Sequence, residues 1–237
     1  MRINEEECNG CGKCIPFCSV DAILKSDKKC WVDQEKCVEC YVCLNSGICP
    51  IDAIEQVQLT WPRIIRHTFS SVIAAHKITG WDGRGTVEMK TNDVTGRYRL
   101  GEVGFTVDVG RPGVGTSFED VEKIAMAVAK LGVAFEPVNP ITKLMTDTLT
   151  GSFRDDVKKE RILSCILEFK TKESQMLPVI EALKEVAKSL NTVFCVGCIS
   201  RCRPDGTIPI KPILDDAGIY NRPNGKINLG LGRPLAL

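Results

Sequence analysis

Eight cysteines near the start of the chain have a spacing that can bind iron. They form two runs, Cys8-x2-Cys11-x2-Cys14-x3-Cys18 and Cys37-x2-Cys40-x2-Cys43-x5-Cys49. A [4Fe–4S] cube needs four thiolates, one for each iron, and three closely spaced cysteines can wrap one corner of it while a fourth comes from elsewhere. Zinc is the alternative, but zinc sites usually use two C-x2-C pairs rather than triple runs with a distal fourth cysteine. The pattern therefore favours iron–sulfur chemistry.

The two runs belong to an internal repeat of about thirty residues, long enough for one supersecondary unit. The first run is followed by Ser19-Val-Asp-Ala-Ile23 and the second by Pro50-Ile-Asp-Ala-Ile54, so both halves end in Cys-x-x-Asp-Ala-Ile. Such a duplication predicts two half-domains related by a pseudo-two-fold axis.

Residues 1–56 resemble the bacterial two-cluster ferredoxins. In that family the fourth cysteine of each run binds the other cluster. The resemblance implies that Cys8, Cys11, Cys14 and Cys49 hold a first [4Fe–4S] cluster and that Cys18, Cys37, Cys40 and Cys43 hold a second. Two features depart from the family pattern: Ser19 stands where a proline is usual, and five residues rather than three precede Cys49.

Composition limits the other classes of function. The chain of 237 residues has a formal net charge of +1, which indicates neither a nucleic-acid nor a membrane partner. No apolar run approaches eighteen residues, so no membrane span is expected, and the first residues carry no secretory signal. We therefore expect a cytoplasmic protein, in which dense cysteine usage indicates metal binding rather than disulfides.

Five further cysteines lie outside the two runs. Cys30 falls between the runs in a predicted short strand, where a partly buried thiol is the expected role. Four others could hold a third cluster or a redox-active pair, or be simple thiols: Cys165, Cys195, Cys198 and Cys202. A third cluster would raise the iron content from about eight to about twelve per chain.

Residues 58–99 are expected to connect two domains, 1–57 and 100–202. Seven basic and three acidic side chains make this segment basic, whereas residues 1–56 hold ten acidic and six basic side chains. His67 and His76 are nine residues apart, do not share a helical face, and are expected to be core or solvated histidines. The stretch 83–97 is rich in glycine and polar groups, and its candidate cofactor-binding residues are Gly83, Arg84, Gly85, Thr91, Asn92, Asp93 and Arg97.

Residues 100–202 predict an α+β domain with the element order βαββαβ. Strands are expected at 103–109, 133–138, 161–171 and 192–196. Ser117 is a plausible N-cap for a helix whose apolar residues recur at helical spacing up to Leu131, with Gly132 just beyond its end. A second helix is expected after Pro178. The region resembles ACT-type regulatory modules, which bind small effectors near a glycine loop between the first strand and the first helix.

The turn Gly110-Arg-Pro-Gly-Val-Gly115 occupies that loop position. It could bring a helix N-terminus to an anion, or be a tight turn without a ligand. Residues 203–237 contain five of the twelve prolines and five of the twenty glycines. This composition predicts an extended arm that lies along its own domain or mediates an oligomer or complex.

A second resemblance covers about residues 1–200. The stretch 83–97, with Gly101-Glu-Val-Gly104 and the turn 110–115, is similar to the N-terminal half of 6-hydroxynicotinate reductase-like proteins. It implies an electron-delivering component of an anaerobic reductase or oxidoreductase, with any flavin on a partner flavoprotein subunit. The alternatives are a redox- or effector-sensing regulator with an ACT-like domain, and a complete enzyme with its site at 83–97. The C-x3-C-x2-C of radical SAM enzymes, the Walker A motif and the nucleophile elbow are absent from the sequence.

Overall fold

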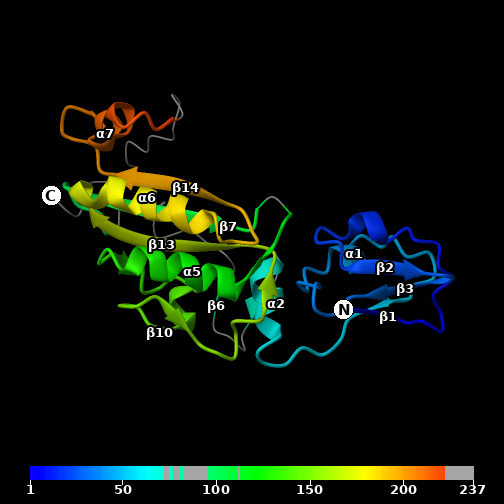
Figure 1. The fold of residues 1–237 in the computed structure, drawn as a ribbon. Coiled ribbons are helices and arrows are strands. Elements are labelled where there is room, and N and C mark those ends of the chain that lie inside the picture. The colour runs from blue at the N-terminus through cyan, green and yellow to red at the C-terminus, as the bar shows by residue number, and fades with distance from the viewer. Residues whose placement is uncertain (72–74, 77–80, 83–95, 112, 222–237) are drawn as a thin grey trace.

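A computed structural model describes residues 1–71, 75–76, 81–82, 96–111 and 113–221 (Figure 1). The described chain has two hydrophobic cores, one within residues 1–54 and one within residues 64–214, so it is α+β with two packed parts. Figure 1 shows helix α2 (Ile64–Ser70) between them. No helix among the described residues has the length and apolar character needed to cross a membrane.

The N-terminal part consists of short elements around cysteine-bearing loops. Strand β1 (Arg2–Ile3) pairs with β4 (Ile54–Glu55), which joins the start of the first repeat to the end of the second. Strands β2 (Ile23–Ser26) and β3 (Lys29–Val32) form an antiparallel hairpin. A 3-10 turn (Ile15–Phe17) and helix α1 (Val42–Asn45) complete this part.

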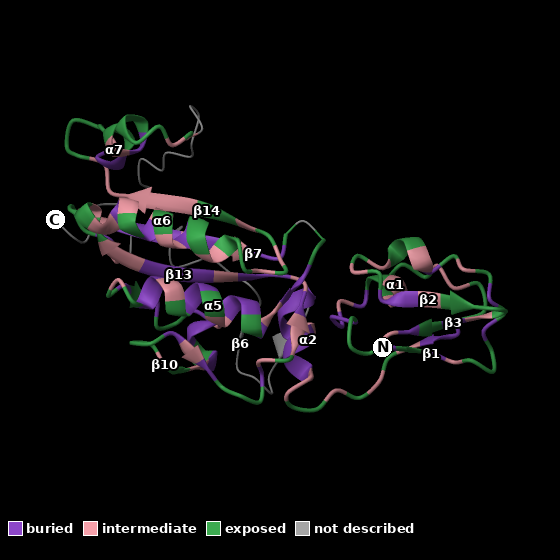
Figure 2. Cartoon of the chain, viewed as in Figure 1, coloured by how far each residue is buried: buried purple, intermediate pink, exposed green. Residues whose placement is uncertain are grey.

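The larger part is built on a four-stranded antiparallel sheet. Its strands are β7 (Glu102–Val109), β9 (Ala134–Phe135), β13 (Cys165–Lys172) and β14 (Phe194–Ser200), in the spatial order β14-β7-β13-β9. Helix α5 (Phe118–Ala129) follows β7 and helix α6 (Met176–Ala187) follows β13. Both helices pack their apolar residues on one face of the sheet, and the main elements run β-α-β-β-α-β (Figures 1 and 2).

Helix α5 begins where the sequence indicates. The Ser117 hydroxyl accepts a hydrogen bond from the Asp120 N–H at 3.2 Å, as expected of an N-cap. Val121, Ile124 and Val128 are fully buried on the inner face of the helix, and Gly132 follows its end with φ +70°. Helix α6 starts at Met176, so Pro178 lies inside its first turn, where the backbone N–H has no helical partner to lose.

The strand expected over 161–171 is two strands instead. β12 (Arg161–Ile162) pairs with β8 (Thr116–Ser117), whereas β13 starts at Cys165 and pairs with β7. The break is stabilised from outside the sheet, because the Leu163 N–H donates to the Ser70 Oγ of α2 at 2.8 Å. Between β9 and β12 the chain forms a small hairpin of β10 (Met145–Asp147) and β11 (Ser152–Phe153).

The prediction of an extended arm from residue 203 is wrong for its described part. Residues Ile210–Asp216 form helix α7, and Ile210 and Leu214 are buried against the larger core. Apolar residues at helical spacing favour a helix here despite the local proline content. Pro209 is the N-cap and Pro212 lies in the first turn, where proline is tolerated. Residues 222–237 of the predicted arm lie outside the described residues.

Candidate metal centre

The first cysteine set converges on one pocket. Cys8, Cys11, Cys14 and Cys49 line it together with Cys30 and apolar residues of the β1–β4 pair, whereas Cys18 does not line it. Cys11 is exposed, and Cys8 and Cys14 are buried. The structure therefore brings together the four residues expected at the first cluster, including the distant Cys49.

The second set gathers around Cys43. Burial, together with the nearby thiols of Cys40, Cys37 and Cys18, raises the pKa of the Cys43 thiol to about 11. The pKa of Cys37 is raised by burial and by the Glu39 carboxylate. Thiols held in this way are protonated at neutral pH, so binding iron has to displace their protons.

The loops around both sets direct backbone N–H groups at sulfur. The Cys8 Sγ accepts hydrogen bonds from the N–H groups of Gly10 and Cys30, each at 3.4 Å. The Cys18 Sγ accepts from Ala22 at 3.1 Å and the Cys49 Sγ from Ala53 at 3.3 Å. Such donors stabilise negative charge on cluster thiolates, so the residues present fit iron–sulfur clusters.

The repeat is visible in this geometry. Asp21 and Asp52 occupy equivalent positions with φ +51° and +53°, and in each case the next residue, an alanine, donates to the fourth cysteine of its run. In the described residues no three His, Cys, Asp or Glu side chains converge on a single metal ion. A cube differs from such a site because each thiolate binds its own iron.

Gly10 shows how tightly the first loop is built. Its φ is +68°, and a Cβ at this position would lie 2.0 Å from the carbonyl oxygen of Lys28. Gly12 has a similar φ of +75°, but its Cβ would meet only the Ile15 side chain at 3.6 Å and the Lys25 side chain at 4.0 Å.

We expect Gly10→Ala to lose the first cluster and about half of the bound iron, because the Lys28 backbone cannot give way without moving β3. The matched variant Gly12→Ala carries the same left-handed strain of about 1–2 kcal/mol without the backbone clash, and is expected to keep its iron. Iron analysis of the two purified variants measures this difference. Equal iron in both would show that the close approach at Gly10 is unimportant.

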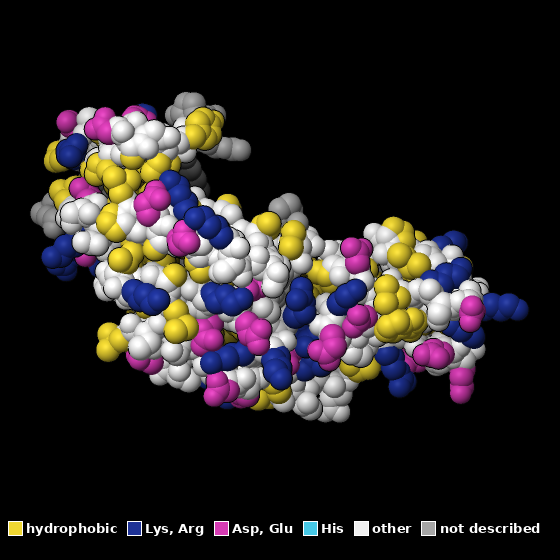
Figure 3. Space-filling model, viewed as in Figure 1, with side chains coloured by type: hydrophobic (Ala, Val, Ile, Leu, Met, Phe, Trp, Pro, Cys, Tyr) yellow, Lys and Arg dark blue, Asp and Glu magenta, His cyan; other side chains and the backbone are white. Residues whose placement is uncertain are grey.

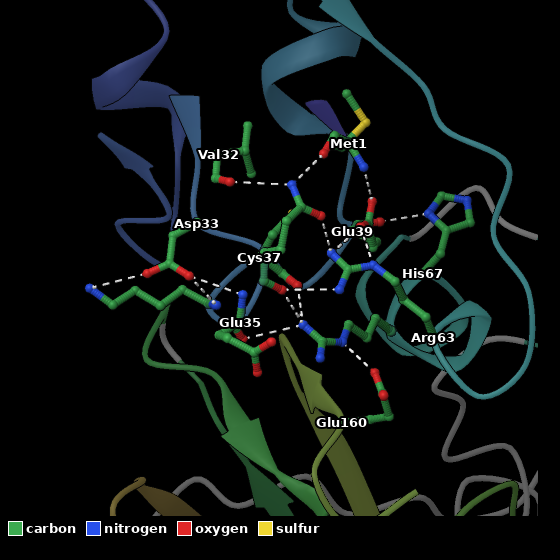
Figure 4. A network of polar contacts seen from close by, with 12 residues as sticks. Met1, Val32, Asp33, Glu35, Cys37, Glu39, Arg63, His67 and Glu160 are labelled. Carbon is green, nitrogen blue, oxygen red and sulfur yellow. Dashed lines mark hydrogen bonds and ion pairs between the residues drawn. The ribbon is translucent and has the colours of Figure 1, made fainter. Parts of the chain in front are cut away.

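An ion-pair network encloses the second loop (Figure 4). Glu39, between Cys37 and Cys40, is fully buried. Its carboxylate accepts from the Met1 amino group at 2.5 Å and from the Arg63 guanidinium at 2.7 and 2.9 Å. A buried carboxylate between two thiolate ligands would be costly without such partners, because all three groups are anionic.

Helix α2 contacts this loop through two more side chains. Arg66, which is 4% exposed, donates to the carbonyl oxygens of Gln34, Glu35 and Cys37 and forms an ion pair with Glu160 of the larger part. The His67 Nδ1–H donates to the Glu39 carbonyl oxygen at 2.6 Å, and its ring stacks on Tyr41 with centroids 4.0 Å apart. Helix α2 therefore fixes the loop of the second set to the larger part.

The spacing of the cysteines gives no sign of this network. The signal that could have found it is charge, since a basic segment at 58–99 follows an acidic one at 1–56. Opposite charges on neighbouring parts of a chain favour contact between them. His67 is neither solvated nor a plain core residue, because its ring and its Nδ1 both contact the second loop.

The four cysteines predicted as a third site do not lie around one point. Strand register places Cys195 opposite Asp108 and Cys198 opposite Phe105, so the two project from opposite faces of β14. Cys165 lies on β13 opposite Val109, across β7 from β14, and is fully buried in the core. Cys202 follows the end of β14. Strand periodicity separates residues that the C-x2-C-x3-C spacing had suggested to be neighbours.

The predicted cofactor residues at 83–97 lie outside the described residues, with the exception of Arg97. The Arg97 guanidinium forms an ion pair with Glu136, and the Arg97 carbonyl accepts from Lys170 Nζ at 2.8 Å. These contacts attach Arg97 to the edge of the four-stranded sheet. They are contacts within the protein and do not by themselves indicate a bound ligand.

The turn 110–115 packs against Ser19 and Val20, which follow Cys18 of the second set. A Cβ at Gly113 would lie 3.6 Å from the Ser19 carbonyl oxygen, and one at Gly115 would lie 3.4 Å from the Val20 side chain. Glu119 and Asp120 occupy the first turn of the helix that follows. Because two carboxylates stand there, the helix start disfavours an anion, and the tight-turn alternative fits the turn better.

Comparison with known proteins agrees with this geometry. Residues 1–24, which contain the first cysteine run, match the family model of the 4Fe-4S binding domain. The chain thus carries a 4Fe–4S binding domain at its N-terminus. Ferredoxin Fdx2 of Sorangium cellulosum (strain So ce56) is 28% identical to the chain over 98 residues, which make up 40% of this chain and 93% of that ferredoxin. No solved structure matches the chain. The similarities support an iron–sulfur electron-transfer role.

Proposed function

We propose that the chain holds two [4Fe–4S] clusters and passes electrons between redox partner proteins. The observation that carries this proposal is the unequal placement of the two cysteine sets. One set lines a pocket that includes the exposed Cys11, whereas the loops of the other contact α2 and the turn 110–115. The first cluster is therefore the outer one and the second is the inner one.

The surface around the outer cluster suits a transient redox partner. Trp31 and Ile51, near Cys30 and Cys49 in the sequence, are 38% and 39% exposed, whereas the similarly exposed Phe17 and Val42 adjoin Cys18 and Cys43 of the second set. Figure 3 shows apolar side chains on this part interspersed with charged ones. Ile51 also lines the pocket of the first set. Small apolar patches with a charged rim are typical of interaction sites, so partner docking beside the outer cluster is expected.

The inner cluster lies beside the larger part of the chain. We propose that this part docks the partner whose redox group receives the electrons, so that the chain is the electron-delivering component of a reductase or oxidoreductase, as the resemblance to 6-hydroxynicotinate reductase-like proteins implies. In this proposal the flavin belongs to a partner flavoprotein subunit. The contact of Arg66 with the Cys37 carbonyl oxygen and the packing of the turn 110–115 on Ser19 and Val20 support this proposal, since they place the larger part beside the second set.

Electron uptake by the anaerobically prepared chain tests this function. We expect coulometric titration to show about two electrons per chain, one for each cluster, and reoxidation of the reduced chain by added free FMN. The same protein treated with a chelator to remove its iron is the control and should take up none. Uptake of no electrons by the iron-loaded chain, or uptake with release of iron, would contradict an electron-transfer role.

A further inference from the structure

The turns 4–8 and 33–37, which lead into the two cysteine runs, are built alike. In each turn the N–H of the cysteine donates to the carbonyl oxygen of the residue four positions earlier, at 2.9 Å. The side chain of that residue, Asn4 or Asp33, also accepts from the N–H two positions further on, at 3.1 and 2.9 Å. The two turns are therefore equivalent parts of the repeat.

Helix α2 covers the second of these turns through Arg66. The guanidinium donates to three carbonyl oxygens, those of Gln34, Glu35 and Cys37, at 2.9, 3.2 and 2.9 Å. Arg63 donates to the Gln34 carbonyl oxygen as well, at 3.0 Å. One buried arginine thus satisfies three carbonyl oxygens of a single turn and attaches a helix beside the inner cluster.

The first turn has no such cover from the described part of the chain. Lys29 Nζ donates to the Cys8 carbonyl oxygen at 2.7 Å, which corresponds to one of the three contacts of Arg66. No hydrogen bond from a described residue reaches the carbonyl oxygens of Glu5 and Glu6. Figure 1 shows the chain after β1 at the end of the N-terminal part that points away from the larger part, where a partner can reach it.

The side chains of the first turn add negative charge to these carbonyl oxygens. Glu5, Glu6 and Glu7 are exposed and form no ion pair with any residue that the structure describes. The equivalent residues 34–36 are Gln, Glu and Lys, which together carry no net charge. A cationic side chain would therefore meet carboxylates as well as carbonyl oxygens at the first turn, and charge-assisted hydrogen bonds are the stronger ones.

We propose that the turn 4–8 docks the redox partner of the outer cluster, and that this partner is a protein whose basic, arginine-bearing helix contacts the turn as α2 contacts the turn 33–37. The inference rests on the proposed function. Cys8 ends the turn and lines the pocket of the first set, so a partner held there lies beside the outer cluster. The chain would then bind elements of the same kind at both clusters, its own α2 at the inner one and the partner's helix at the outer one.

Lysines near the first set favour a different partner, one with an acidic surface. Lys13 lines the pocket, and a Cβ at Gly12 would lie 4.0 Å from the Lys25 side chain. The turn 4–8 is the better candidate because its equivalent in the same chain already binds a basic helix. The two partners also respond in opposite directions when negative charge is removed from the turn.

The test is stopped-flow oxidation of the reduced chain by cytochrome c, a basic redox protein. Replacing the three glutamates of residues 5–7 by glutamine should slow this reaction about tenfold at low ionic strength, because a cationic partner is no longer steered to the turn. Reoxidation by free FMN, which is an anion, should not slow. Glu6→Gln alone should slow cytochrome c, whereas the matched variant Glu35→Gln, which removes one exposed carboxylate from the equivalent turn, should not. Iron analysis of each variant checks that its clusters are retained.

Carbodiimide cross-linking of the chain to cytochrome c, read by mass spectrometry, locates the contact. We expect amide bonds between cytochrome c lysines and the carboxylates of residues 5–7. A wild-type rate in the triple variant, equal slowing by Glu6→Gln and Glu35→Gln, or cross-links confined to other carboxylates would overturn the inference. A wild-type chain that holds no clusters, or that is not reoxidised by FMN, would instead refute the proposed function.

Discussion

Cys18→Ala is expected to lose the second cluster and keep the first, although Cys18 belongs to the first run. The thiol of Cys18 is among those that crowd Cys43, and Cys49 lines the pocket of the first set. Removing either fourth cysteine should therefore damage the cluster of the opposite run and lower the iron content from about eight to about four per chain.

Double variants show which cluster is lost by iron content alone. If Cys18 and Cys37 serve one cluster, Cys18→Ala combined with Cys37→Ala should lose no more iron than either change alone. Cys18→Ala combined with Cys8→Ala should instead remove nearly all of it. The reverse pattern would mean that each run binds its own cluster. Cys202→Ala, outside both sets, is the control and should keep its iron.

Arg66→Ala is expected to separate the inner loop from the larger part. The guanidinium is almost fully buried and holds three carbonyl oxygens of residues 34–37 as well as Glu160. Its removal leaves these acceptors and a carboxylate without their cation. Breaking a buried ion pair in this way costs about 3–5 kcal/mol. Arg66→Lys should recover only part of the loss, because one ammonium on a shorter stem cannot reproduce the guanidinium fork.

Guanidinium chloride unfolding followed by circular dichroism measures the loss of stability, and cluster absorbance in the same samples reports cluster release. We expect Arg66→Ala to unfold at lower denaturant and to release part of its cluster absorbance first. Lys184→Ala removes an ion pair in which both side chains are more than half exposed, and is expected to leave the unfolding curve unchanged. An unfolding curve of Arg66→Ala that matches the wild type would show that the network does not couple the two parts.

Local patterns predict the features that depend on neighbouring residues. Cysteine spacing identifies eight thiols that the structure gathers into two sets, because a cluster-binding loop is specified by its own sequence. The cap at Ser117, the buried stripe of α5 and the order of the main elements follow from periodicity in the same way. The relation of Cys49 to the first run needed the family resemblance, since spacing alone cannot show a crossing.

Features that depend on distant contacts are missed. The break at Leu163 requires a hydroxyl from Ser70, ninety-three residues away, and Arg66 joins the loop 34–37 to Glu160. Cys30 looks like an ordinary strand residue until β3 places it in the pocket of the first set. The cysteines of the expected third site are close in sequence but not in space. Cys195 and Cys198 lie three residues apart on β14 and so face opposite sides of the sheet.

The central claim, that this chain carries two four-iron clusters at its N-terminus, is tested most directly by iron and acid-labile sulfide analysis of the anaerobically purified protein. The account predicts about eight irons and about eight sulfides per chain, held by thiolates of the two cysteine sets. About four of each, or bound metal without sulfide, would contradict it.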